Sequence, residues 1–263
     1  MGGGAGFKLY VHAYCPSSYR VVKHLADKGL VEKFELIPLN PDNPVFLATS
    51  IPSVPALAIG GRLVAVDPLE PQFVEGLATG GSIREFIPLS DVEVVERFIN
   101  SVKASSYLMI HLALGGLSIE EVLSTNFPEV AARVYFSGLS GSYVREVILS
   151  RMGTLAEALA SSYLRSVAYS YVRDVAISSG TLSRDLLDLK YLKLWLTAKL
   201  SQGIAFTPLM EGHLEQAEVR LREVLAYLLE KYEVIAGYFE KYITELRSNP
   251  ELYKLLTKGN RKT

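Results

Sequence analysis

The chain changes character after residue 81, and this change most constrains its fold. In the first part, a helical pattern at 19–30 separates the first two of four short apolar runs. These runs predict strands at 7–12, 34–37, 56–59 and 63–66. A strand–helix–strand start predicts a parallel pair, and Gly60-Gly61 between the last two runs predicts an antiparallel hairpin. Residues 7–82 are therefore expected to form an α/β domain with the order β-α-β-α-β-β-α.

The remainder of the chain follows a helical period. Asp91 is the expected N-cap of the first helix there, and Ser118 and Glu121 have the spacing of a capping box. Further helices are expected at 118–126, 128–137, 141–151, 154–178 and 183–201. Beyond Pro208 one apolar stripe continues for about eight turns, which predicts the spine of a helical bundle.

These patterns predict two folded domains. With 263 residues, of which 49% are apolar and 21% charged, the chain is long enough for both and has a globular composition. The expected parts are a glycine-rich, disordered start (1–6), the α/β domain (7–82), a linker (83–89) and an all-α domain (90–263).

Charge and composition exclude several classes of function. The formal net charge of −1 predicts neither nucleic acid nor an acidic membrane as a partner. A single cysteine excludes an intramolecular disulfide, and four scattered histidines predict no metal cluster. The most apolar window, 107–117, is too short to span a bilayer, and no signal-peptide pattern is visible. A soluble, cytoplasmic protein without a membrane span is therefore expected.

The single cysteine, Cys15, lies where the first strand gives way to the first helix. The free amides and the positive dipole end of a helix N-terminus stabilise a thiolate there. The alternative is a buried, inert cysteine, because free cysteine is among the most buried residue types. Position alone leaves both interpretations open.

Four stretches resemble, in order, the glutaredoxin and glutathione transferase branches of the thioredoxin-fold superfamily. They are Cys15–Arg20, Lys28–Leu30, Asn43–Leu47 leading into Ile51–Leu57, and Gly60–Leu63. The first is similar to the Cys-Pro-x-Ser/Ala-x-Arg motif of omega-class transferases and chloride intracellular channel proteins. The resemblance covers residues 7–80 and implies a thioredoxin-like, glutaredoxin-type domain, followed by a helical domain, in a homodimer.

The resemblance implies that Cys15 is a thiolate nucleophile. Pro16 occupies the first helical turn, so the amides of Ser17 and Ser18 remain to face the sulfur. The Ser18 hydroxyl either donates to the sulfur or belongs to an ordinary first-turn serine. Ser18 also stands where dithiol glutaredoxins have their resolving cysteine, so the motif is monothiol.

Other residues are implied to bind the substrate. Val54-Pro55 resembles the cis-proline turn of this fold, where the backbone before the proline docks a peptide-like thiol as an added strand. Arg20 either holds an anionic substrate or is a solvated surface residue. Tyr14 either packs beside the site or lies in the core.

One departure concerns the residues after the hairpin. Transferases place an acidic residue and a serine or threonine there, which hold the γ-glutamyl end of glutathione. Here the sequence has Asp67-Pro68. Asp67 keeps the carboxylate, but Pro68 has neither a side-chain hydroxyl nor a backbone N–H. This argues against glutathione itself as the ligand.

Two functions follow. The first is a monothiol thiol–disulfide oxidoreductase or thiol transferase that acts through Cys15 on mixed disulfides of small thiols or proteins. It requires no cofactor and uses a small thiol, glutathione or another, as cosubstrate. The second is a non-catalytic thioredoxin-fold module whose helical domain binds a partner. We favour the first because the Cys-Pro-x-Ser-x-Arg pattern is complete.

Overall fold

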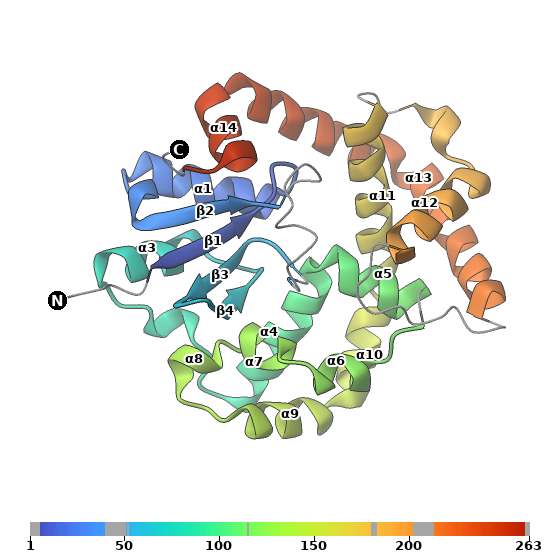
Figure 1. Cartoon of the computed structure of the whole chain (residues 1–263). Helices are drawn as coiled ribbons and strands as arrows, with labels where there is room; N and C mark the ends of the chain where they lie inside the picture. Colours follow the sequence, from blue (N-terminus) through green and yellow to red (C-terminus); the bar gives the residue numbers. More distant parts are fainter. Residues whose placement is uncertain are drawn as a thin grey trace. The chain divides into compact units, whose positions relative to one another are not determined.

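The computed structural model describes residues 6–39, 51, 53–114, 116–179, 183–201 and 213–260. It has a small mixed sheet near the N-terminus, followed mostly by helices (Figure 1). The chain divides into two compact units. Unit 1 takes its described residues from 1–101, 126–152 and 243–263, and unit 2 from 102–125 and 153–242.

The sheet of unit 1 has four strands in the order β2-β1-β3-β4. Their bounds are Phe7–Val11 (β1), Phe34–Pro38 (β2), Ala56–Ile59 (β3) and Arg62–Val66 (β4). β1 runs parallel to β2 and antiparallel to β3, with Leu9 opposite Leu36 and Leu57. Gly60 and Gly61 have positive φ values of 59° and 83°, as the tight turn between β3 and β4 requires. The predicted parallel pair and hairpin are confirmed.

Helix α1 (Pro16–Asp27) follows β1 directly. Its apolar face buries Val21, Val22 and Leu25, which explains why this segment forms an amphipathic helix against the rest of unit 1. Gly29, in the left-handed region with φ 67°, ends the helical turn. Because Pro16 stands at the first helical position, α1 begins immediately after Cys15.

The other helices of unit 1 come from three separate parts of the sequence. They are α3 (Pro71–Thr79), most of α4 (Asp91–Ala104), α7 (Phe127–Ala131), α8 (Val134–Ser137), α9 (Gly141–Leu149), the end of α13 (His213–Ser248) and α14 (Pro250–Lys258). A 3-10 turn, η2 (Arg84–Phe86), lies within the predicted linker.

The C-terminal helix α14 lies against α1 and β2 (Figure 1). Leu252 and Leu256 are its buried residues. After the helix, the Asn260 side chain accepts from the N–H of Leu36 at 2.9 Å and donates to the carbonyl of Phe34 at 2.7 Å. An added amide thus satisfies backbone groups on the open edge of β2, which would otherwise be available to another strand.

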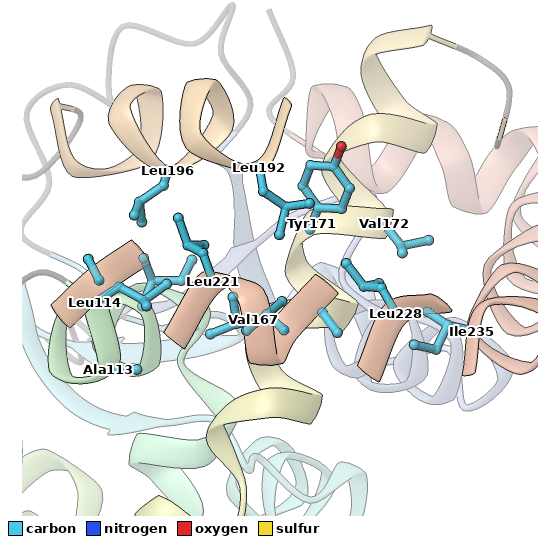
Figure 2. Close-up of a cluster of buried hydrophobic side chains, with 14 of the residues drawn as sticks. Ala113, Leu114, Val167, Tyr171, Val172, Leu192, Leu196, Leu221, Leu228 and Ile235 are labelled. Atoms are coloured by element: carbon cyan, nitrogen blue, oxygen red, sulfur yellow. The ribbon is translucent and has the colours of Figure 1, made fainter. Parts of the chain in front are cut away.

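Unit 2 is built around its own apolar core (Figure 2). Its helices are α5 (Ser106–Leu114), α6 (Ile119–Ser124), α10 (Met152–Ala160), α11 (Tyr163–Ser179), α12 (Leu189–Ser201) and α13 up to Tyr242. Met152, the first residue of α10, is assigned to unit 1. Buried side chains of α5, α11, α12 and α13 form one cluster, which includes Leu114, Val167, Leu192, Leu221 and Leu228. The apolar stripe of α13 therefore does form the spine of a helical core.

Several expected helices are shorter than the sequence predicted. The helix expected at 128–137 is interrupted because Arg133 adopts a left-handed conformation between α7 and α8. The helix expected at 154–178 is broken between Ala160 and Tyr163. The Asp91 prediction is wrong as well, because the hydroxyl of Ser90, not Asp91, accepts from the N–H of Glu93 at 3.4 Å.

The capping box of Ser118 and Glu121 is confirmed.

The two units interleave along the chain, whereas the sequence predicted consecutive domains. The domain boundaries at 82 and 90 stay predictions. Residues 1–5 of the expected disordered start and the stretch Asn43–Leu47 lie outside the described residues. Of the helices in the described ranges, none combines the length and apolar character needed to cross a membrane.

Candidate thiol site

Cys15 is the N-cap residue of α1 and is partly exposed. Its Sγ accepts a hydrogen bond from the backbone N–H of Ser18 at 3.5 Å. The same sulfur donates to the carbonyl of Val54 at 3.3 Å. The thiol therefore occupies the position where an N-cap side chain satisfies a free helix amide, and a second segment 39 residues away contacts it.

The loop before α1 is held by two further hydrogen bonds. The Cys15 N–H donates to the carbonyl of His12 at 3.0 Å. The Ser18 hydroxyl accepts from the N–H of His12 at 3.2 Å and is buried. The amide of Ser18 thus faces the sulfur, while its hydroxyl anchors the loop. This geometry gives the Ser18 hydroxyl a supporting position in the loop before α1, and its donation to the thiol stays a prediction.

The Val54–Pro55 peptide bond is cis, as the resemblance implies. Pro55 is buried and Val54 is partly exposed beside the sulfur. The structure also has a second cis bond, Asp67–Pro68, which the sequence did not predict.

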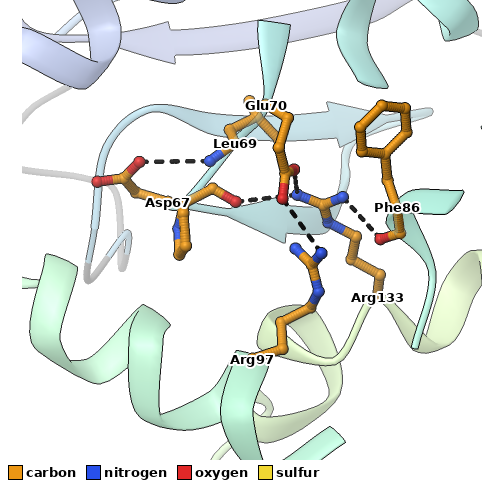
Figure 3. Close-up of polar contacts among 7 residues, drawn as sticks. Asp67, Leu69, Glu70, Phe86, Arg97 and Arg133 are labelled. Carbon is orange, nitrogen blue, oxygen red and sulfur yellow. Dashed lines mark hydrogen bonds and ion pairs between the residues drawn. The ribbon is translucent and has the colours of Figure 1, made fainter. Parts of the chain in front are cut away.

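Asp67 follows β4 and is only 6% exposed. Its Oδ1 accepts from the N–H of Leu69 at 3.3 Å (Figure 3), and its carboxyl is hydrogen-bonded to the Ser17 side chain. Burial raises the pKa of Asp67 to about 6, although these hydrogen bonds and the charge of Arg20 lower it. The structure therefore brings Asp67 to the first turn of α1, as a buried group.

Arg20 is exposed and donates to the Ser17 hydroxyl at 3.3 Å. Tyr14 is partly exposed, and its phenol is hydrogen-bonded to Tyr253 of α14. The pKa of Tyr14 is raised mainly by burial and to a smaller extent by this hydrogen bond. Arg247 at the end of α13 acts in the opposite direction on the same pKa. The C-terminal helices thus reach the loop that carries the thiol.

No family model, curated protein or solved structure matches this chain. The resemblance to thioredoxin-fold proteins therefore stays a prediction. Within the described ranges, no group of three or more histidine, cysteine, aspartate or glutamate side chains is arranged to hold a metal ion.

Sequence reasoning missed two residues near this site. Tyr253 contacts Tyr14 from the far end of the chain, and Arg133 contacts the residues that follow Asp67. A tyrosine on an amphipathic helix and an arginine between two short helices are ordinary local patterns. No signal in the sequence distinguishes them, because their roles depend on contacts across 47 or more positions.

Asp67 makes the stability of unit 1 depend on pH in a direction that can be tested. A pKa of about 6 lies above the ordinary value of 3.8, so the stabilising contribution of this group is complete below pH 3.8 and is lost as pH rises through 6. The rise corresponds to about 3 kcal/mol at neutral pH. Asp67→Asn is expected to be more stable than the parent at pH 8 by up to that amount.

Calorimetric unfolding of the parent and Asp67→Asn at pH 4 and pH 8 measures this difference. The stability gained by the variant should grow from pH 4 to pH 8. Glu85→Gln is a suitable control, because it makes the same kind of change at an exposed carboxylate of the same unit. A stability difference between Asp67→Asn and the parent that stays constant across this interval contradicts the prediction.

Proposed function

We propose that this protein is a monothiol thiol–disulfide oxidoreductase in which Cys15 is the nucleophile. The observation that carries the proposal is the position of the Cys15 sulfur, which accepts a hydrogen bond from the Ser18 amide at the start of α1. Amides at a helix N-terminus favour the thiolate, which is the form that attacks disulfides. The partial exposure of Cys15 gives a small substrate access to it.

The sheet topology supports a thioredoxin-like fold. Strand β1 pairs in parallel with β2. Strands β3 and β4 form an antiparallel hairpin, and the order in the sheet is β2-β1-β3-β4. The parallel pair and the hairpin are features of the glutaredoxin-type arrangement inferred from the sequence. In such a fold the cis-proline turn and the thiol meet at one end of the sheet, which agrees with the contact between Val54 and Cys15.

The reaction proceeds by two exchanges. The Cys15 thiolate attacks one sulfur of a mixed disulfide, a new S–S bond forms, the old one breaks, and the leaving thiolate takes up a proton. Because the chain has no second cysteine, a small thiol from solution must then attack the intermediate as its thiolate. This step releases Cys15 and a small-molecule disulfide, so the small thiol supplies the reducing electrons.

The surrounding groups suggest how the substrate is held. We expect the backbone of Val54, which contacts the sulfur, to pair with an extended thiol substrate. The exposed Arg20 side chain donates to the Ser17 hydroxyl in the first turn of α1. Asp67 is buried and already hydrogen-bonded to Ser17, so it supports the first turn of α1. The proposed partner is a small thiol, or a protein carrying one as a mixed disulfide.

The pH dependence of Cys15 alkylation by iodoacetamide tests the proposal. Half-maximal reactivity is expected well below the ordinary thiol value of about 8.5, within the range of about 3.5–7.5 found at helix N-termini. The single cysteine makes the signal specific, and the same protein unfolded in urea provides the matched control. A midpoint at or above 8.5 in the folded protein contradicts the proposal.

A turnover assay separates this function from the second candidate. Exposed apolar side chains on α12 and α13, among them Leu194, Val219 and Val234, favour a module whose helices bind a partner. An activated thiol together with reduction of small mixed disulfides supports the oxidoreductase. An activated thiol without any such reduction supports the binding module instead.

A further inference from the structure

Arg133 combines two unfavourable features at one residue. It is 0% exposed, and among the described residues other than glycine only Arg133 has a positive φ, of 53°. Burying a guanidinium is costly unless its charge and donors are matched, and a left-handed backbone adds of order 1 kcal/mol or more for such a side chain. An arginine held under these conditions needs specific partners.

The partners of Arg133 lie on the segments that follow β4. Nη1 donates to the Phe86 carbonyl at 2.9 Å, and Nη2 donates to the Pro68 carbonyl at 2.9 Å. Nη2 also pairs with the Glu70 carboxylate (Figure 3). The guanidinium lies 4.0 Å from the centroid of the Phe73 ring. One planar cation thus joins the Pro68 carbonyl and the Glu70 carboxylate of the turn after β4 to the backbone of Phe86.

This turn is the one that carries Asp67. Pro68 and Glu70 flank Leu69, and the N–H of Leu69 donates to Asp67. Arg133 therefore binds this turn on both sides of Leu69, the residue whose N–H orients the Asp67 carboxyl. The charge on Glu70 is also matched from α4, because Arg97 donates to its other carboxylate oxygen at 3.1 Å (Figure 3).

We propose that Arg133 is a positioning residue of the thiol site, which holds the Asp67–Glu70 turn so that the Asp67 carboxyl stays buried against the first turn of α1. This inference rests on the proposed function of Cys15, since it gives the buried carboxyl a place in that site. Arg133 touches neither the sulfur nor a substrate. It acts through the turn.

The titration of Asp67 distinguishes positioning from simple charge compensation. The groups that face Asp67 are Ser17 and Arg20 from α1 and Glu70 before α3. If the turn stayed in place, loss of the Arg133 charge would leave Glu70 less compensated and would raise the Asp67 pKa. If the turn is released, the carboxyl becomes hydrated and its pKa falls toward 3.8, because burial is the main cause of its present value.

The experiment follows the carboxyl carbon of Asp67 by NMR across pH in protein labelled at aspartate, with the resonance assigned by its loss in Asp67→Asn. The variants are Arg133→Met and Arg133→Lys. The lysine variant keeps a positive charge and replaces the methionine variant in the measurement if that variant does not fold. Arg97→Met is the matched control, because it removes a cation from the same Glu70 without touching Pro68 or Phe86.

A fall of about 1 pH unit or more in the Asp67 midpoint is expected in the Arg133 variant and not in Arg97→Met. The KM for a small mixed disulfide should rise about 10-fold in the same variant. An unchanged or raised midpoint in the Arg133 variant, or an equal fall in Arg97→Met, overturns the proposal. Absence of turnover in the parent would refute the proposed function alone, since the Asp67 titration is measured without substrate.

Discussion

Replacing Cys15 with serine is expected to abolish the reduction of mixed disulfides, with a loss of more than about a thousandfold. A serine hydroxyl forms neither a thiolate nor a disulfide at neutral pH. The variant should nevertheless fold, because serine is a preferred N-cap residue and its hydroxyl can accept from the Ser18 amide as the sulfur does. Turnover of a small mixed disulfide by a coupled assay, with circular dichroism to check the fold, measures this result.

Ser18→Ala is the informative control for this experiment. Because the Ser18 hydroxyl is bonded to the N–H of His12, its removal deletes this hydrogen bond and should cost about 0.5–1.5 kcal/mol of stability. The amide that faces the sulfur remains, so the variant should keep a reactive thiol. Substantial turnover in Cys15→Ser would show that the chemistry lies elsewhere in the chain.

Replacing Leu228 with alanine is expected to destabilise unit 2 by about 2–5 kcal/mol. Leu228 lies on α13, is 0% exposed, and belongs to the cluster formed with α5, α11 and α12 (Figure 2). Truncation removes apolar burial and leaves a cavity that rigid helices fill incompletely. Urea unfolding can be followed by the fluorescence of Trp195, the single tryptophan, which packs against this cluster.

The neighbouring residue on the same helix provides the matched control. Leu229 is 57% exposed, so Leu229→Ala makes the same chemical change on the solvated side of α13. Its effect on the unfolding free energy should stay within about 0.5 kcal/mol. Equal effects of the two substitutions on the Trp195 transition would contradict the burial pattern of α13.

Local patterns in the sequence were sufficient for much of the fold. The apolar runs, the Gly60-Gly61 turn and the capping box of Ser118 depend on residues that are close in the chain, and each was predicted correctly. Helix interruptions were harder to predict. The break at Arg133 comes from a left-handed residue whose side chain is held by distant partners, which no periodicity can reveal.

The candidate site likewise combines features set by neighbouring residues in the sequence with features set by distant contacts. The sequence by itself determined that a lone thiol stands at the start of a helix, because the strand pattern, Cys15 and Pro16 are contiguous. Only the tertiary structure decided that Val54 reaches the sulfur and that Tyr253 reaches Tyr14. Only the tertiary structure also decided that Asp67 is buried. The physical reason is that burial and hydrogen bonding depend on what packs against a group, and for these residues the partners lie far away in the sequence.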